Sequence, residues 1–184
     1  MLLLSAMAIS ESDSARIEAL IAKLAEGDIE AMGPIYDMTR TPVYAYALSL
    51  LKNSSEAEDV LHDCYLRLYR ASATYTPSGK PMAFIMTVTR NLCLDRLNEL
   101  NRFSRIPEES WETLLRTDGL ESNIETAQML DALKDDERQI VLLHAVAGFR
   151  HRETAKLMGL PLSTVLSKYS RALKKLRTYC GKEP

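Results

Sequence analysis

Three residues near the C-terminal end of the chain have the types and the spacing of a helix-turn-helix. Ala155 lies four residues before Gly159, and Val165 follows that glycine by six residues. A small residue lets a second helix approach closely, and glycine accepts the positive φ of a tight turn. Val165 and Leu160 would fill the wedge between the two helices. The spacing therefore predicts helices at about 151–158 and 162–178, with the second one suited to the DNA major groove.

The second of these helices carries polar and basic side chains that suit DNA, and Pro161 favours its start. The candidates for base edges are Ser163, Thr164, Ser167, Lys168 and Arg171, and those for phosphates are Lys174, Lys175 and Arg177. Arg138, Arg150, Arg152 and Lys156 add to the local surplus of positive charge. The competing interpretation is a plain helical hairpin with a solvated basic end.

Composition is that of a foldable protein, with 46% hydrophobic and 26% charged residues and only 7 Gly and 7 Pro. The formal net charge of -2 does not itself indicate nucleic-acid binding. It averages over segments of different sign, so the distribution of charge is more informative than its sum.

No pattern indicates catalysis, a metal or a cofactor, and we expect none of them. The cysteines, Cys64, Cys93 and Cys180, lie too far apart for a paired metal motif and fit a reducing cytosol, as buried or idle thiols. His62 and Cys64 are two residues apart and would not face each other on a helix. His144 and His151 are interpreted as a residue at the core edge and a polar residue at a helix start. The tyrosines at helical spacing, Tyr44, Tyr46, Tyr65 and Tyr69, are expected to pack in the core and at its rim rather than to hold a cofactor.

Helical periodicity runs through most of the chain, which predicts an all-α fold. We expect helices at about 14–26, from Asp28 to Thr41, from Pro42 to Leu51, and at 56–72, 81–101, 123–132 and 135–147. Asp28 and Ser55 are the expected N-caps, and Pro42 is expected to separate two helices. Val60, Leu61, Cys64, Tyr65 and Leu68 form the predicted apolar stripe of the helix at 56–72.

The chain divides into two small helical domains joined by a linker. We expect an N-terminal extension with the first helix at 1–27, a helical domain at 28–101, a linker with the lone Trp111 at 102–121, and the helix-turn-helix domain at 122–184. The segment Met1–Ile9 lacks the basic start of a signal peptide and is too short to span a bilayer. We therefore expect a cytoplasmic protein without membrane insertion.

Two blocks of sequence resemble a known family. Asp131–His144, the helix-turn-helix at His151–Lys168 and Ser170–Arg177 resemble region 4 of the sigma-70 family of RNA polymerase sigma factors. Ala57–Arg70 and Pro81–Arg96 resemble region 2, in the family's order. The short linker without a third domain is similar to that of the extracytoplasmic-function (ECF) group.

The resemblance implies a factor that binds core polymerase, at the β′ clamp helices and the β flap, and promoter DNA. By this resemblance Asp59, His62, Asp63, Leu66, Arg67 and Arg70 would bind polymerase. Tyr75, Lys80, Phe84, Arg90, Asn91 and Arg96 would open and read the minus-10 element. Arg152, Ser163, Thr164, Ser167, Lys168, Arg171, Lys174 and Lys175 would read the minus-35 element.

Some residues depart from the family's pattern. His62 stands where Gln is usual, Phe84 where Trp is common, and Leu166 where the recognition helix frequently has a basic residue. The exchange at Leu166 bears on minus-35 reading, because it removes one phosphate or base contact.

Two other functions compete with that of an initiation factor. The first is a sigma-like decoy that sequesters an anti-sigma factor, a further candidate partner, and a degraded basic face would favour it. The second is a one-component helix-turn-helix regulator with a ligand pocket in its N-terminal domain. The region 2 blocks do not suit this second function.

Overall fold

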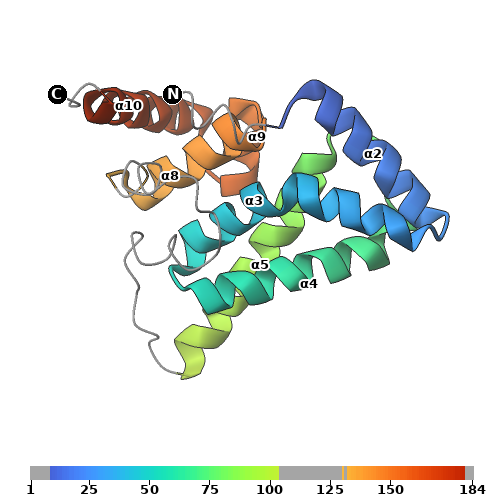
Figure 1. The fold of residues 1–184 in the computed structure, drawn as a ribbon. Coiled ribbons are helices and arrows are strands. Elements are labelled where there is room, and N and C mark those ends of the chain that lie inside the picture. The colour runs from blue at the N-terminus through green and yellow to red at the C-terminus, as the bar shows by residue number, and fades with distance from the viewer. Residues whose placement is uncertain (1–8, 104–129, 131, 181–184) are drawn as a thin grey trace.

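The computed structural model describes residues 9–103, 130 and 132–180, and within these ranges the chain is helical without any strand. The elements are α2 (Glu11–Ala25), η1 (Ile29–Ala31), α3 (Met32–Leu51), α4 (Ser54–Ser72), α5 (Pro81–Phe103), α8 (Asp135–Val141), η2 (Leu142–Val146), α9 (His151–Met158) and α10 (Leu162–Cys180). Figure 1 shows α2 to α5 as one group of helices, with α8, α9 and α10 at one side of it. The predicted all-α fold with two helical domains is confirmed. Trp111 and nearly all of the predicted linker and of the helix at 123–132 lie outside the described residues.

Helix α2 begins three residues before the predicted start, because Ser10 forms a capping box with Asp13. The Ser10 hydroxyl accepts from the Asp13 amide at 3.1 Å, and the Asp13 carboxylate accepts from the Ser10 amide at 3.1 Å. Beyond the C-terminal end of the helix, Gly27 has a φ of 96°, which a residue with a Cβ rarely adopts. The prediction that Asp28 caps the next element was wrong in part, since its side chain makes no capping hydrogen bond.

Helix α3 runs without interruption through Pro42, so the prediction of two helices separated there was wrong. Proline has no amide hydrogen and costs the helix one hydrogen bond. Helix α3 is packed against α2, α4 and α5, and residues on both sides of the proline, including Thr39, Val43 and Tyr46, are buried. The free energy of this burial offsets the cost of the proline.

Helix α4 is capped by the Asn53 side chain, which accepts from the Glu56 amide at 3.0 Å, so Ser55 was wrongly predicted as the cap. The predicted apolar stripe is buried in full, and α5 begins at Pro81 as predicted. Burial raises the pKa of the Cys64 thiol to about 11 and that of Cys93 to about 12, which fits the prediction of buried thiols.

The four tyrosines behave differently. Tyr44, Tyr46 and Tyr65 are buried, as expected for packing residues, and the Tyr65 hydroxyl lies 2.8 Å from the Thr39 hydroxyl. Tyr69 is 46% exposed on the outer side of α4. Three of the four therefore lie in the core, and the partly exposed Tyr69 fits the predicted rim position.

The helix predicted at 135–147 changes its winding. Helix α8 passes at Leu142 into the π-helical turn η2, which ends at Val146. Val141, Leu142 and Val146 pack with Ala172 and Leu176 of α10 in a small hydrophobic cluster. This cluster fixes α10 against α8, and with it the position of the helix-turn-helix.

Candidate nucleic-acid interface

The turn between α9 and α10 has the predicted helix-turn-helix geometry. Gly159 adopts a φ of 66°, and the Leu160 amide donates to the Ala155 carbonyl at 3.0 Å. Val165 is fully buried and forms a cluster with Ala155 and Ile140, against which Leu160 packs. The small residue, the glycine and the β-branched residue thus have the roles expected from their spacing.

The outer side of α10 presents one continuous face to solvent. From Ser163 to Arg177 its exposed side chains follow helical spacing and are Ser163, Leu166, Ser167, Ser170, Arg171, Lys174 and Arg177. We call this set the reading face. Of the predicted minus-35 residues, Ser163, Ser167, Arg171 and Lys174 belong to it, Thr164 is half-buried beside it, and Arg152 is exposed on α9. The reading face is uncharged in its N-terminal half and basic in its C-terminal half.

Two predicted DNA contacts, Lys168 and Lys175, turn instead towards α8. Lys168 Nζ lies 2.7 Å from Asp136 Oδ2, and Lys175 Nζ lies 2.6 Å from Glu137 Oε2. Glu137 is only 3% exposed, and burial alone would raise its pKa. Hydrogen bonds from Lys175 and from the Lys134 amide outweigh that effect and lower the pKa. These lysines therefore hold α10 on α8 in this structure.

Arg138 belongs to the local surplus of positive charge but does not lie on the surface. It is 3% exposed, and its guanidinium donates to the carbonyls of Leu130 at 2.8 Å and Leu133 at 3.0 Å. The Leu130 carbonyl also accepts from the Leu133 amide at 3.2 Å, so the guanidinium adds a second donor there. Buried carbonyl oxygens near a helix start require such donors. Arg138 thus stabilises the start of the domain and is unavailable to DNA.

His144 and His151 stack on each other beside Tyr169. Their ring centroids are 3.9 Å apart, and each lies 4.8 Å from the Tyr169 ring. Burial lowers the pKa of His151, and the nearby His144 lowers it further. The sequence placed one histidine at the core edge and the other at a helix start, but spacing alone did not predict that they touch.

The loop from Tyr75 to Lys80 is held by a residue that the sequence reading missed. Glu18 of α2 accepts from the Ser78 and Gly79 amides at 2.8 Å and from the Tyr75 hydroxyl at 3.0 Å. Tyr75 also packs against Phe84 of α5, with ring centroids 5.1 Å apart. The structure thus brings together Tyr75, Phe84 and Lys80. No motif marks Glu18, because its role depends on contacts across about 60 residues of sequence.

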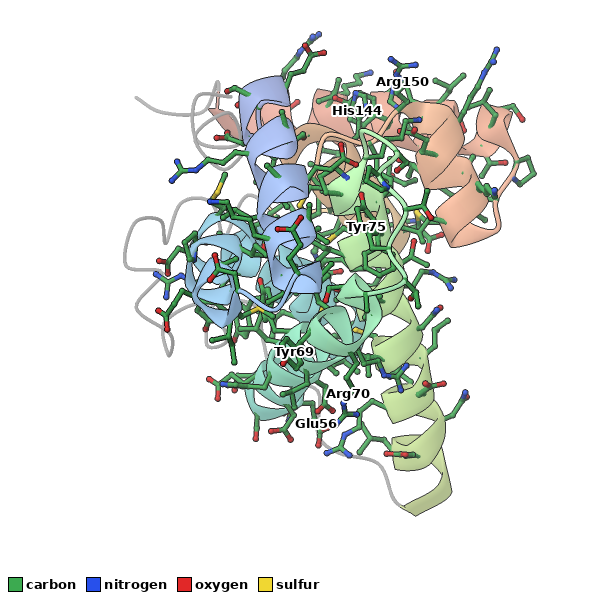
Figure 2. The ribbon with its side chains drawn as sticks, turned by 90° about the vertical axis from the view of Figure 1, so that its right-hand side faces the viewer. Glu56, Tyr69, Arg70, Tyr75, His144 and Arg150 are labelled. Carbon is green, nitrogen blue, oxygen red and sulfur yellow. The ribbon has the colours of Figure 1, made fainter. Side chains whose placement is uncertain are left out.

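The other predicted minus-10 residues lie further along α5. Asn91 is exposed and Arg90 is half-buried near Tyr46. Arg96 pairs with Glu56 and Asp59 of α4 and with Glu99. Its charge is therefore compensated within the protein, and it lies with the α4 surface rather than with the loop. Figure 2 shows Glu56 at the end of the bundle far from Tyr75.

Helix α4 presents all six predicted polymerase-binding side chains to solvent. Arg67 lies 3.9 Å from Asp95 of α5, and Asp59 lies 3.6 Å from Arg96. Asp59, His62, Asp63 and Arg67 line an open groove with Leu92, Asp95, Arg96 and Glu99. Leu66, 55% exposed, and Tyr69 add apolar surface to this charged face. The surface has the mixture of apolar and charged groups that protein interfaces use.

The loop at 75–80 and the helix-turn-helix touch each other. Lys80 forms an ion pair with Glu153 of α9, and Figure 2 shows Tyr75 on the side of the bundle that carries His144 and Arg150. Phe149 is 5% exposed and belongs, with Leu143, to the large hydrophobic cluster of α2 to α5. Lys52 Nζ lies 3.1 Å from Asp135 Oδ2. The two halves therefore share a core and salt bridges.

Comparison with known proteins identifies the family of this chain. A model of sigma-70 region 2 matches residues 35–103, and a model of sigma-70 region 4 matches residues 124–176. The chain is a sigma-70 family sigma factor of the ECF group. Helix α2 and its Glu18 precede both matched ranges.

The sigma factor is 26% identical over 178 residues to the ECF sigma factor SigK of Mycolicibacterium vanbaalenii, with 91% of each chain covered. It is 29% identical over 185 residues to the ECF sigma factor BldN of Streptomyces coelicolor, covering 91% of this chain and 67% of BldN.

Solved structures share the fold of this sigma factor. CnrH, solved with the cytosolic domain of CnrY, is 22% identical with a TM-score of 0.58, over 92% of this chain and 99% of the other. RpoE, solved with the anti-sigma factor NepR from Bartonella quintana, is 18% identical with a TM-score of 0.58, over 81% and 96%. Within the described ranges, no helix is long and apolar enough to cross a membrane. The same residues contain no cluster of three or more side chains that could hold a metal ion.

Proposed function

We propose that this sigma factor directs promoter-specific initiation by binding core polymerase and reading both promoter elements. The observation that carries the proposal is the helix-turn-helix turn at Gly159, which sets a solvent-facing α10 beside the packed core of the domain. Recognition helices contact base edges through their N-terminal turns, and basic residues further along bind phosphates. The reading face has this order, from Ser163 to Arg177.

The minus-10 strand would be held at Tyr75, Phe84 and Lys80. Aromatic side chains stack with unpaired bases, and a lysine pairs with phosphate. Capture of an extruded base offsets its unstacking cost of roughly a few kcal/mol, so opening requires no hydrolysis by this subunit. Asn91 and Arg90 on α5 would continue towards duplex DNA, whereas Arg96 supports the α4 surface in this structure.

Reading two elements requires the halves of the molecule to separate. Elements about 25 base pairs apart are about 85 Å apart at a rise of about 3.4 Å per base pair. Here Lys80 of the loop contacts Glu153 of the helix-turn-helix domain. We therefore propose that the contacts between the halves break in the promoter complex, which frees Lys80 for phosphate.

Core polymerase would dock on the exposed face of α4, through its β′ clamp helices. The face combines Leu66 with Asp63 and Arg67, so a partner of complementary charge gains both apolar burial and steering. The α10 side of the molecule would be near the β flap. An anti-sigma factor is a further partner that we propose, supported by the solved complex of RpoE with NepR.

Transcription with core polymerase tests the proposal directly. Genomic fragments of the source organism serve as templates, and the transcripts are sequenced to locate their starts. We expect starts preceded by shared elements, present only when the sigma factor is added. Absence of any factor-dependent start, with a folded protein, would contradict the function and would favour the decoy.

Charge reversal on α4 tests the docking face. Asp63→Lys should weaken binding to core polymerase by about 1 kcal/mol or more, because it places like charges together in the interface. The matched control is Asp37→Lys, an exposed aspartate on α3. Equal affinities of the two variants, measured by titration with labelled protein, would argue against this face.

A further inference from the structure

Leu166 is an exposed apolar side chain in the middle of the polar reading face. It is 45% exposed in the second turn of α10, one residue after the fully buried Val165. A single exposed apolar side chain is common on protein surfaces and needs no explanation by itself. Leu166, however, lies in the part of a recognition helix that enters the major groove of DNA.

The neighbours of Leu166 make it the longest side chain in the N-terminal half of the face. Ser163 and Ser170 lie three residues before and four residues after it on the same side of the helix, Ser167 follows it directly, and all three are exposed. The Ser167 hydroxyl donates to the Thr164 carbonyl of its own helix at 3.0 Å. Within this half of the face, Leu166 therefore extends further from the helix than the serines around it.

The charge on the same face specifies the kind of partner. Exposed basic side chains follow on the next turns, at Arg171, Lys174 and Arg177. A matching partner is therefore a polyanion that also presents one apolar group to Leu166. In the major groove of DNA the apolar group of a base edge is the C5 methyl of thymine. A leucine can neither donate nor accept a hydrogen bond, so it cannot read the guanine that an arginine reads at such a place.

We propose that Leu166 is a specificity residue that selects a thymine in the upstream promoter element by packing against its methyl group. This inference rests on the proposed function, because it requires that α10 lies in the major groove. It makes the sequence preference of this sigma factor depend on a methyl contact rather than on a charge.

The test removes the thymine methyl and the leucine separately. Holoenzyme, made from core polymerase and the full chain, selects promoters from a duplex library with a randomised upstream segment. Each thymine of the selected element is then replaced singly by deoxyuridine, which keeps base pairing and lacks the methyl group. Binding is compared for the unmodified sigma factor, Leu166→Ala, Leu166→Arg and the control Thr178→Ala, an exposed residue of α10 beyond the reading face, with helicity checked by circular dichroism.

We expect one thymine whose replacement weakens binding by about fourfold, the factor that burial of one methyl-sized group provides. Leu166→Ala should bind the thymine and the deoxyuridine duplex equally, and Thr178→Ala should keep the fourfold difference between them. Leu166→Arg should select guanine at that position. Discrimination that persists in Leu166→Ala, or is absent from the unmodified protein, overturns the inference while leaving upstream reading intact. Selection of no upstream element at all contradicts the proposed function as well.

Discussion

The two surfaces that we assign to DNA are organised in different ways. The reading face of α10 is positioned by packing, since Val165, Ala172 and Leu176 on the opposite side are buried. The loop at 75–80 is positioned by carboxylates from distant helices, Glu18 of α2 and Glu153 of α9. The reading face is held by a hydrophobic core and keeps its position when DNA binds. The loop at 75–80 is held by carboxylates of the protein, and DNA phosphates can take the place of these carboxylates. We therefore propose that α10 is a preformed interface, whereas the loop at 75–80 must lose internal contacts before it can bind DNA.

The largest effect should come from removing the packing that supports α10. Val165→Asp places an unpaired charge in a fully buried site and should lower the free energy of unfolding by about 3 kcal/mol or more. Leu166→Asp, the control one residue later, should stay within about 0.5 kcal/mol of the unmodified protein. Urea denaturation measures both. Equal destabilisation would show that the exposed side chain is also part of the core.

Loss of a cation from the reading face should have the next largest effect. Arg171→Ala should weaken binding to promoters with a minus-35 element by about 1 to 2 kcal/mol. If the arginine contacts phosphate, the slope of the logarithm of the binding constant against the logarithm of salt concentration should also become shallower by about one. Arg16→Ala, an exposed arginine on α2, is the control. Equal transcription by Arg171→Ala from promoters with and without that element would refute a role in reading it.

The next prediction concerns Glu18 and its hydrogen bonds to the loop at 75–80. Burial alone would raise the pKa of Glu18, but hydrogen bonds from the Gly79 and Ser78 amides and from Tyr75 outweigh it and lower the pKa. Because the folded pKa is lowered, the contribution to stability is present above pH 4.5 and is lost as pH falls through the lower folded value.

An NMR titration of the Gly79 amide should therefore have its midpoint below pH 4.5. Glu18→Ala should abolish that titration. It should also reduce the protection of the Gly79 amide against hydrogen exchange by about fivefold, which is the contribution of a hydrogen bond to a charged group after a discount for solvent exposure. Glu11→Ala, at the start of the same helix, should change neither. A Gly79 midpoint at or above the ordinary value would mean that Glu18 does not hold the loop.

The smallest effect concerns the ion pair between the halves. The side chains of Lys80 and Glu153 are 52% and 25% exposed, and such pairs contribute about 0.2 to 1 kcal/mol. Glu153→Gln should therefore strengthen binding of a single-stranded minus-10 oligonucleotide by at most about fivefold, and less at high salt. The same substitution in a Lys80→Ala background should have no effect. A gain that persists without Lys80 would assign the effect to another contact.

The sequence-based predictions were confirmed at positions where the local structure admits few residue types, such as a turn that requires glycine. Gly159 at the turn and Val165 in the wedge were predicted from spacing, and the buried stripe of α4 from periodicity. It failed at Pro42, because burial across α3 outweighs a local rule. The choice of Ser55 over Asn53 as a cap failed because adjacent polar residues are equally capable of capping.

Site residues were harder to predict, because charge pairing depends on elements that meet only in the folded chain. Lys168 and Lys175 had the spacing of DNA contacts, yet α8 brings Asp136 and Glu137 to them. Arg138 looked like a surface cation and is buried. Arg96 pairs with α4. The exposed polar residues of α4 and α10 are where the sequence placed them, since a helix with one buried face leaves its other face exposed.

The shared core of the two halves has a thermal consequence. Leu143 and Phe149 are covered by the helices of the N-terminal half, so separation of the halves transfers apolar surface into water. Hydration of that surface raises the heat capacity, and the hydrophobic free energy of closure weakens on cooling. If the halves separate in the promoter complex as we propose, the balance between the closed and the separated form shifts with temperature, and cold favours the separated form.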